Sequence, residues 1–474
     1  MNKKNKIHLI GISGAGMSAL AVLLKEAGFK VSGSDDESFE PVAGLLKRNK
    51  ISFHENYRPE NIPGDVNLVV IGKHAGLSER DNVETREAIR RDLPIKSLPE
   101  MLALLSNRTE NLVIAGSFGK STLSALVAWC LVRGKKDPSY FIGAIPLDLK
   151  NSSHLGRGGE FVLEGDEYPS SNWDNTSKFL HLKPNAVLLI SALHDHVNMF
   201  PTEKSYVATY KKLVAKIPAK GLLVYAKNAK NTKEVARHSK CRTLSYSVDD
   251  KKSDWFAENL KYGKVTSFDL IRKGKKIIKI ETKLLGRHNI ENIVGAAAFL
   301  LESNLPAQAG KISPPVFAGA VKSFSGIKRR IELKNPKGTI PVYDGFGSSY
   351  EKARAIFDAL HLHFPDKRIV AVFEPHAFSW RNKKFLPWYK NIFKGVDEVI
   401  ILPATSRGPK GPGEISTSEI WREAKKHFPV RTARNEKETL KILQKIVRDG
   451  DVIALISSGP MFGLTESVPK IFAH

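Results

Sequence analysis

Short apolar runs alternate with longer amphipathic stretches along almost the whole chain. Runs such as KIHLIG, VNLVVIG and NLVIAG are rich in apolar and β-branched residues and end in glycine, which is typical of buried strands. The stretches between them repeat apolar residues at helical spacing, as in MSALAVLLKEAG. This alternation predicts an α/β protein in which helices cover mainly parallel sheets.

The length of 474 residues exceeds the size of one ordinary core and predicts about three domains. New strand-like runs begin at NLVIAG and near KGTIPVYDG, so we expect domains at residues 1–106, 107–325 and 326–474. We expect the first and last domains to be Rossmann-like. Residues 240–285 alternate with a period of two, which predicts a small antiparallel sheet in the middle domain, with a hairpin at residues 273–275.

The cysteine content and the apolar runs indicate in which cellular compartment the protein is expected. Cys130 and Cys241 are too few for a disulfide framework and have no close partners at metal-ligand spacing, which favours a reducing, cytoplasmic location. The lysine-led start of the chain resembles a signal peptide, but three glycines interrupt its apolar stretch and Lys25 and Glu26 end it. No other uninterrupted apolar run is long enough to span a bilayer, so we expect no membrane span.

The formal net charge of +25 suggests a nucleic-acid partner. However, the lysines are scattered through every segment, and no interleaved aromatic RNA-binding signature accompanies them. We therefore expect a solvated basic surface and no dedicated nucleic-acid binding. The RNA-binding alternative would show a steep salt dependence of affinity. A positive field also favours polyanionic substrates such as nucleotides.

The sharpest motif is a glycine loop between a strand-like run, LVIA, and a helical run, LSALVAWCLV. In such a loop the backbone amides hold phosphate oxygens, a lysine neutralises them and a hydroxyl holds Mg²⁺. Ile114 stands where the longest form of the motif has glycine, so this is a shorter variant; a turn that merely joins strand to helix is the alternative interpretation. We expect a central P-loop ATPase domain that binds ATP through Gly116, Ser117, Gly119, Lys120, Ser121 and Thr122.

Acidic residues follow two further strand-like runs of the middle domain. EFVLEGDEY ends in Glu164, Asp166 and Glu167, and NAVLLISALHDHV ends in Asp195 and His196. Acidic groups at the carboxyl edge of a parallel sheet, beside a phosphate loop, can ligate Mg²⁺ directly or through water. The His-Asp-His cluster alone would be a weak zinc signal, and beside the loop it predicts a second metal or proton-handling position. We expect the metal ligands to be Ser121, Thr122, Glu164 and His196.

A second glycine-rich turn lies in the first domain, between KIHLI and the helix MSALAVLLKEAG. Residues 14–19 fit the dinucleotide fingerprint G-x-G-x-x-A, and Asp35 follows the second strand, where it suits a ribose hydroxyl. Alone, this fingerprint would support an NAD-dependent enzyme, but such an enzyme has no use for the separate ATP loop. We expect a nucleotide diphosphate to be bound by Gly11, Gly14, Ala15, Gly16, Met17, Ser34 and Asp35.

In order along nearly the whole chain, these motifs resemble those of the Mur ligase family of cell-wall synthesis. The likeness is greater to the subgroup that charges UDP-N-acetylmuramate, whose opening glycine motif holds the UDP group. EGDEY resembles the family's metal motif, and KRRIE at residues 328–332 resembles the arginine motif that reaches the ATP phosphates. GRHNIEN is similar to the motif that meets adenine, here at His288, Asn289 and Asn292.

The resemblance implies an ADP-forming enzyme that makes a C–N bond, with ATP and Mg²⁺ as cofactors. The carboxylate of UDP-N-acetylmuramate would attack the γ-phosphate to give an acyl phosphate, from which the amine displaces phosphate. Closure of the domains is expected to precede this chemistry. The residues expected to be catalytic are Lys120, Arg329, Arg330, Asp344 and His196.

The most specific part of the prediction is the identity of the amine substrate. FIGAIPLDL, SNWDNTSKFLHLKPNAVLL and ISSGPMFG are more similar to members that attach L-alanyl-γ-D-glutamyl-meso-diaminopimelate, in peptidoglycan recycling, than to members that attach L-alanine. Residues 344–350, DGFGSSY, depart from the family's Asp-Asp-Phe/Tyr-Ala-His-His-Pro by one acid and both histidines. Gly345 and Gly347 predict a pliable loop with room for a larger amine. L-Alanine as the amine and a catalytically weakened nucleotide-binding relative are the alternatives.

Overall fold

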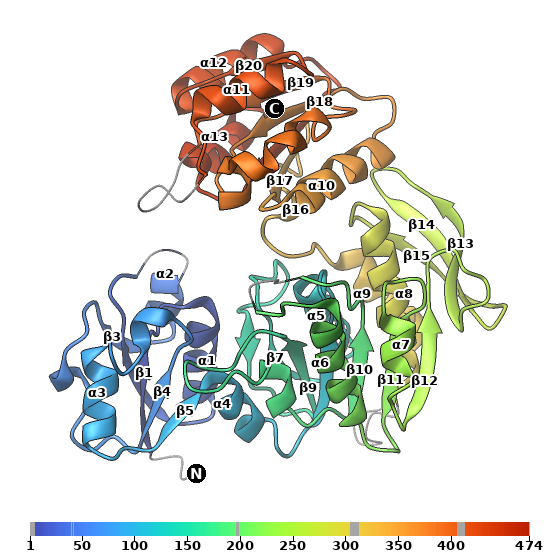
Figure 1. Cartoon of the computed structure of the whole chain (residues 1–474). Coiled ribbons are helices and arrows are strands. Elements are labelled where there is room, and N and C mark those ends of the chain that lie inside the picture. The colour runs from blue at the N-terminus through green and yellow to red at the C-terminus, as the bar shows by residue number, and fades with distance from the viewer. Residues whose placement is uncertain are drawn as a thin grey trace. The chain divides into compact units, whose positions relative to one another are not determined.

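The computed structural model describes residues 5–38, 40, 42–195, 199–303, 312–404 and 413–473. Helices and strands alternate, and the strands form three sheets, which confirms the predicted α/β class (Figure 1). Packing divides the chain into two compact units, of which the first holds the five-stranded sheet and most of the ten-stranded sheet. The first unit comprises Met1–Asn259, Phe268–Ile280 and Glu291–Phe324, and the second comprises Leu260–Ser267, Glu281–Ile290 and Ser325–His474. The three domain boundaries expected from the sequence stay a prediction.

The N-terminal sheet has five parallel strands in the order β3-β2-β1-β4-β5. Helices α1, α2 and α4 pack on one face, against Ile7 and Leu9, while α3 packs on the other face, against Val69 and Ile71. This order places a crevice between β1 and β4, outside their carboxyl ends. The elements are β1 Lys6–Ile10, α1 Ala15–Glu26, β2 Lys30–Ser34, α2 Val42–Arg48, β3 Ser52–His54, β4 Leu68–Ile71, α3 Val83–Arg90, β5 Ile95–Ser97 and α4 Leu98–Leu105.

The central sheet has ten strands in the order β15-β14-β13-β12-β11-β10-β6-β9-β7-β8. Strand β6 lies between β10 and β9 and is parallel to both, so the loops that follow these three strands meet at one edge of the sheet. The strands are β6 Glu110–Ala115, β7 Ser139–Phe141, β8 Ser153–His154, β9 Glu160–Gly165, β10 Ala186–Leu189, β11 Leu222–Ala226, β12 Arg242–Tyr246, β13 Trp255–Lys261, β14 Thr266–Arg272 and β15 Lys275–Thr282. The helices are α5 Lys120–Arg133, α6 Glu203–Ala215, α7 Thr232–Ala236, α8 Arg287–Glu302 and α9 Pro314–Ser323.

Residues 240–285 extend this sheet at one edge instead of forming a separate one. The antiparallel prediction is wrong for β12, which pairs in parallel with β11. The alternation that suggested it arises because Ser245 is a buried polar residue, whose amide and hydroxyl both donate to Asp254 Oδ2 at 2.8 Å. The predicted hairpin turn is confirmed: Lys273 and Gly274 separate β14 from β15 with φ angles of 45° and 78°.

The C-terminal sheet has six strands in the order β16-β17-β21-β18-β19-β20, and only β16 runs antiparallel to its neighbour. Alternate residues of β18 face two cores: Ala371 and Phe373 pack with α10 and α11, whereas Val370 and Val372 pack with α12 and α13. The elements are β16 Arg330–Leu333, β17 Val342–Phe346, α10 Tyr350–His363, β18 Ile369–Phe373, β19 Glu398–Ile401, α11 Thr417–Lys425, β20 Val430–Thr432, α12 Glu436–Ile446, β21 Val452–Ser457 and α13 Leu464–Ile471. In the described part of the chain, no helix is long and apolar enough to cross a membrane.

Candidate active site

The phosphate loop links β6 to α5 in a conformation that glycine makes possible. Gly116 and Gly119 have φ angles of +151° and +80°, and a Cβ on Gly116 would lie 2.9 Å from the backbone nitrogen of Ser191. The loop is tied to the segment after β10, because the Ser117 amide donates to Ser191 Oγ at 3.1 Å and the Ser117 hydroxyl donates to Leu193 O at 2.6 Å. The loop and the start of α5 therefore form a fixed cradle at a helix N-terminus.

Lys120 folds back over this cradle. Its Nζ donates to Gly116 O and to Glu167 Oε2, both at 2.7 Å, and its side chain is 13% exposed while that of Glu167 is fully buried. Burial by itself lowers the pKa of Lys120, but attraction to Glu167, and then to Asp166 and Glu164, outweighs burial and raises the pKa above its ordinary value. The loop thus holds a charged ammonium at the N-terminus of α5.

The three acids after β9 differ in their partners. Asp166 Oδ2 pairs with Lys178 Nζ at 2.7 Å, whereas Glu164 accepts from Ser121 Oγ at 2.8 Å and from the Gly143 amide at 2.7 Å and has no lysine at ion-pair distance among the described residues. Burial raises the pKa of Glu164, although the Gly143 amide and Lys120 oppose the shift. A carboxylate without a paired cation, next to a hydroxyl, supplies the oxygen donors that Mg²⁺ prefers.

The predicted metal ligands are therefore brought together only in part. Ser121 and Glu164 lie in hydrogen-bond contact, and Thr122 makes no side-chain hydrogen bond to any described residue. His196 lies outside the described residues. Within the described part of the chain, no group of three or more His, Cys, Asp or Glu side chains is arranged to hold a metal ion. The residues fit a Mg²⁺ ion that takes its remaining ligands from nucleotide and water.

A cavity of about 310 Å³ begins at this cluster and extends to the N-terminal glycine turn. Lys120, Glu164, Asp166 and Lys178 give it a charged end, and Gly16 lies in its wall. The side chains of α4 and of residues 179–182 supply an apolar wall. The complete lining is Gly16, Leu98, Pro99, Leu102, Lys120, Phe141, Gly143, Glu164, Asp166, Tyr168, Lys178, Phe179 and Leu182.

The predicted diphosphate turn lies between β1 and α1. The carbonyl of Ser34, at the end of β2, accepts from the Gly11 amide at 2.8 Å, and Gly11 has a φ of +81°. Gly14 is the N-cap of α1, and Ala15, Gly16 and Met17 form its first turn. The turn thus stands at a helix N-terminus, as a diphosphate site requires.

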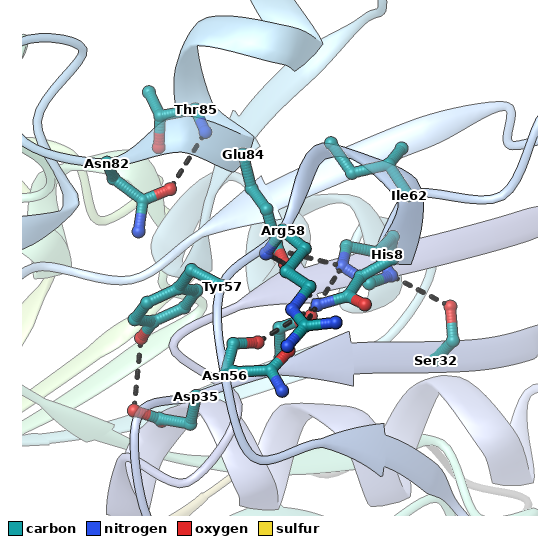
Figure 2. Close-up of polar contacts among 12 residues, drawn as sticks. His8, Ser32, Asp35, Asn56, Tyr57, Arg58, Ile62, Asn82, Glu84 and Thr85 are labelled. Atoms are coloured by element: carbon teal, nitrogen blue, oxygen red, sulfur yellow. Dashed lines mark hydrogen bonds and ion pairs between the residues drawn. The ribbon is translucent and has the colours of Figure 1, made fainter.

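The structure gives Asp35 an architectural role within this turn. Its Oδ2 accepts from the Ser13 amide at 2.7 Å, and its Oδ1 accepts from the Tyr57 hydroxyl at 3.0 Å. Figure 2 shows the Tyr57 ring reaching down to this carboxylate. The Asp35 carboxylate therefore helps to hold the glycine turn in its conformation. Its contact with a ribose hydroxyl stays a prediction.

Sequence reasoning missed a buried network that supports the same turn (Figure 2). His8 and Glu84 are fully buried; His8 Nε2 lies 3.4 Å from Glu84 Oε2, and His8 Nδ1 lies 2.9 Å from Ser32 Oγ. Glu84 Oε1 accepts from the Arg58 amide at 3.0 Å and from Asn61 Nδ2 at 2.8 Å. The network fastens the loop that carries Tyr57. A histidine inside the apolar run KIHLI was the signal that could have revealed it.

The predicted adenine residues divide between the two units. In the first unit, Asn292 lies by the phosphate loop, since a Cβ on Gly119 would be 3.5 Å from Asn292 Oδ1. In the second unit, His288 is exposed at the surface, but desolvation by the surrounding protein, with further contributions from Arg330 and His363, lowers its pKa to about 4. The neighbouring Asn289 Nδ2 donates to Leu285 O at 2.8 Å. His288 is thus neutral at physiological pH.

The second unit brings Arg329 and Asp344 together. Arg329 donates to the carbonyls of Ser457 and Gly459 at 3.0 and 2.9 Å, and its Nε lies 3.7 Å from Asp344 Oδ2. Burial raises the pKa of Asp344 to about 6, against the opposing attraction of Arg329. The guanidinium of Arg330 lies 5.3 Å from the centre of the Phe346 ring. The predicted basic pair and acid therefore share the carboxyl end of β17.

The loop that departs from the family pattern is tightly packed. A Cβ on Gly345 would lie 2.5 Å from Ile356 Cδ1, and one on Gly347 would lie 2.4 Å from Ile456 Cγ2. The expectation of a pliable, roomy loop is therefore wrong, because these glycines are required by close packing and not by mobility. The hydroxyl of Ser349 accepts from the Lys352 amide at 3.4 Å and caps α10.

Comparisons with known proteins agree with this geometry. Residues 6–110 match the model of the Mur ligase family catalytic domain and residues 114–300 match that of the Mur ligase middle domain, together more than half of the chain. The UDP-N-acetylmuramate–L-alanine ligase of Aquifex aeolicus is 29% identical over 470 residues, which cover 98% of this chain and 97% of the relative.

Two solved structures share the fold over nearly the full length. The UDP-N-acetylmuramate–alanine ligase of Thermotoga maritima has a TM-score of 0.76 at 21% identity, and the match covers 98% of this chain and 99% of the Thermotoga chain. The murein peptide ligase of Psychrobacter arcticus has a TM-score of 0.66 at 23% identity and covers 99% of both chains. This chain belongs to the Mur ligase family, whose members are ATP-dependent ligases that form amide bonds.

Proposed function

We propose that the chain activates the carboxylate of UDP-N-acetylmuramate with ATP and joins it to the tripeptide L-alanyl-γ-D-glutamyl-meso-diaminopimelate. The observation that carries the proposal is the cavity that has Gly16 of the N-terminal glycine turn in its wall and Lys120 and Glu164 at its charged end. A sugar held by its diphosphate at Gly16 extends through this cavity toward the phosphate loop. Its carboxylate then faces a bound γ-phosphate.

The residues of the loop supply the activation chemistry. On nucleotide binding, Lys120 exchanges Glu167 for phosphate oxygens, and the Tyr206 hydroxyl, 3.2 Å from Glu167 Oε1, continues to stabilise that carboxylate. Ser121 and Glu164 would hold Mg²⁺, which would supply positive charge to the transferred phosphoryl group. The carboxylate oxygen forms a bond to the γ-phosphorus as the bond to ADP breaks, and the amine afterwards displaces phosphate. Arg329, Arg330 and Asp344 are proposed to serve the same reaction from the second unit.

The tripeptide is supported by SNWDNTSKFLHLKP, because this segment resembles the corresponding segment of tripeptide-adding members. L-Alanine is the second candidate. It is supported by the full-length relative from Aquifex aeolicus, whose name specifies L-alanine as the amine.

The test is phosphate release from ATP with UDP-N-acetylmuramate present and each amine offered separately, with products identified by mass spectrometry. The tripeptide product is the expected result. Ligation of L-alanine alone would select the second candidate. ATP binding without either product would indicate a weakened relative, and the absence of both ATP and UDP-N-acetylmuramate binding would overturn the whole assignment.

A further inference from the structure

Lys178 is a second lysine in the wall of the cavity, with no role among the predicted site residues. Its side chain is 26% exposed, its Nζ lies 2.7 Å from Asp166 Oδ2, and it lies 6.0 Å from the centre of the Tyr168 ring. Both Lys178 and Lys120 line the cavity, and no other described lining residue is a lysine, arginine or histidine.

A substrate carboxylate at the charged end of the cavity needs a cation that a bound nucleotide does not already engage. Lys120 is paired with Glu167, and a nucleotide would draw Lys120 to its phosphates. Glu164 and Asp166 are acids in the same wall and would repel an incoming carboxylate. Lys178 is then the one described lining residue whose positive charge can offset this repulsion.

The ion pair between Lys178 and Asp166 does not use all the N–H donors of the Lys178 ammonium. An ammonium has three N–H donors, and the Lys178 ammonium donates one hydrogen bond to the described residues, to Asp166. Asp166 Oδ2 accepts this hydrogen bond at 2.7 Å and so fixes the ammonium in place. The neighbouring apolar wall of Leu98, Phe141 and Phe179 suits the methyl groups of a lactyl ether and an acetamide.

We propose that Lys178, oriented by Asp166, binds the lactyl carboxylate of the muramyl substrate and aligns it for attack on the γ-phosphate. The proposal rests on the function proposed above and holds for either amine. Lys178 neutralises the carboxylate in the ground state. It releases this attraction when the new oxygen–phosphorus bond turns the carboxylate into an uncharged acyl group, while the charge moves to the phosphates.

The test compares the binding of two nucleotide sugars that differ in this group, because UDP-N-acetylglucosamine lacks the lactyl carboxylate. Calorimetry without ATP should show that Lys178→Met weakens UDP-N-acetylmuramate binding about 10-fold to 100-fold, the worth of one charge-assisted hydrogen bond, with UDP-N-acetylglucosamine binding unchanged. Lys178→Arg should restore part of the difference. Lys183→Met is the matched control, because Lys183 is an exposed lysine close in sequence and outside the cavity lining.

The outcomes separate the two proposals. If the unaltered protein binds UDP-N-acetylmuramate and Lys178→Met binds it equally well, the assignment of Lys178 is overturned and the proposed function stands. If both sugars lose affinity equally in Lys178→Met, the lysine serves the architecture of the cavity, which also overturns the assignment. If the unaltered protein binds neither sugar, the proposed function itself fails. A thermal melt of each variant checks that the fold is intact.

Discussion

The buried pair of Lys120 and Glu167 allows the chemistry of the phosphate loop to be separated from its contribution to stability. Lys120→Met keeps most of the side-chain length but removes the charge, so the fully buried Glu167 loses its lysine partner. Removing one partner of a buried ion pair costs about 3–5 kcal/mol. The lower end of that range is expected here, because the Tyr206 hydroxyl remains 3.2 Å from Glu167 Oε1.

A double variant, K120M/E167Q, supplies the matched control. Its neutral amide still accepts a hydrogen bond from Tyr206, so the free energy of unfolding should return to within about 1 kcal/mol of the original value. Both variants should lose phosphate release by about 10²-fold to 10³-fold, because neither can place a cation on the transferred phosphoryl group. Urea unfolding measures the first quantity, and colorimetric phosphate release with UDP-N-acetylmuramate and amine measures the second.

Two results would refute this reasoning. Phosphate release near the original rate in the stable double variant would remove the loop from the mechanism. A loss of stability below about 1 kcal/mol in the single variant would show that the pair is worth no more than an exposed one.

Three further predictions follow from particular contacts. Gly16→Val should weaken UDP-N-acetylmuramate binding and leave ATP binding unchanged in calorimetry, because a Cβ at Gly16 already lies 2.9 Å from Leu98 Cδ1; tight NAD binding instead would contradict the diphosphate assignment. Gly347→Ala should lower the free energy of unfolding by about 1–3 kcal/mol through overpacking, whereas Gly319→Ala, with nothing within 4 Å, should not lower it in the same urea titration. The pKa of Asp344 is raised from 3.8 to about 6, so the folded state holds the extra proton between these values and stability should fall as pH rises through this range. Asp344→Asn should abolish that fall in urea titrations at several pH values, and an unaltered profile would exclude Asp344 as its source.

The sequence predicted the elements best where a local signal and a tertiary requirement coincide. The strand, glycine loop and helix at residues 110–133 are such a case, because the positive φ angles of the turn need Gly116 and Gly119, and Gly116 also allows the close approach of Ser191. The order of the strands within each sheet could not be predicted in this way. Hydrophobic periodicity shows which face of a strand is buried, but it does not show which strands lie beside it. The error at β12 has the same origin: the buried position of Ser245 depends on Asp254, which no pattern around the serine reveals.

The site was predicted less completely, because its supporting contacts join distant parts of the chain. Glu84 meets His8 across 76 positions, and Lys120 meets Glu167 across 47, although both lysine and acid had been singled out. Lys178 lies within a segment that resembles tripeptide-adding members, but its place in a binding site becomes clear only from its contact with Asp166 and from the cavity lining. Motifs name the residues that touch ligands, whereas the residues that hold them in place emerge from packing.

The loop after β17 shows how a departure from a family motif can still be a constrained structure. Ser349 caps α10, and Gly347 fits against Ile456 with no room for a Cβ, so the replacements serve the fold. A cation also stands at this loop, because Lys352 Nζ donates to Ser348 Oγ at 3.2 Å, next to the position of the family's histidines. A lysine keeps its charge at a pH where histidine loses it. The loop therefore keeps a basic group beside Ser348, which argues for an altered site and against a merely decayed one.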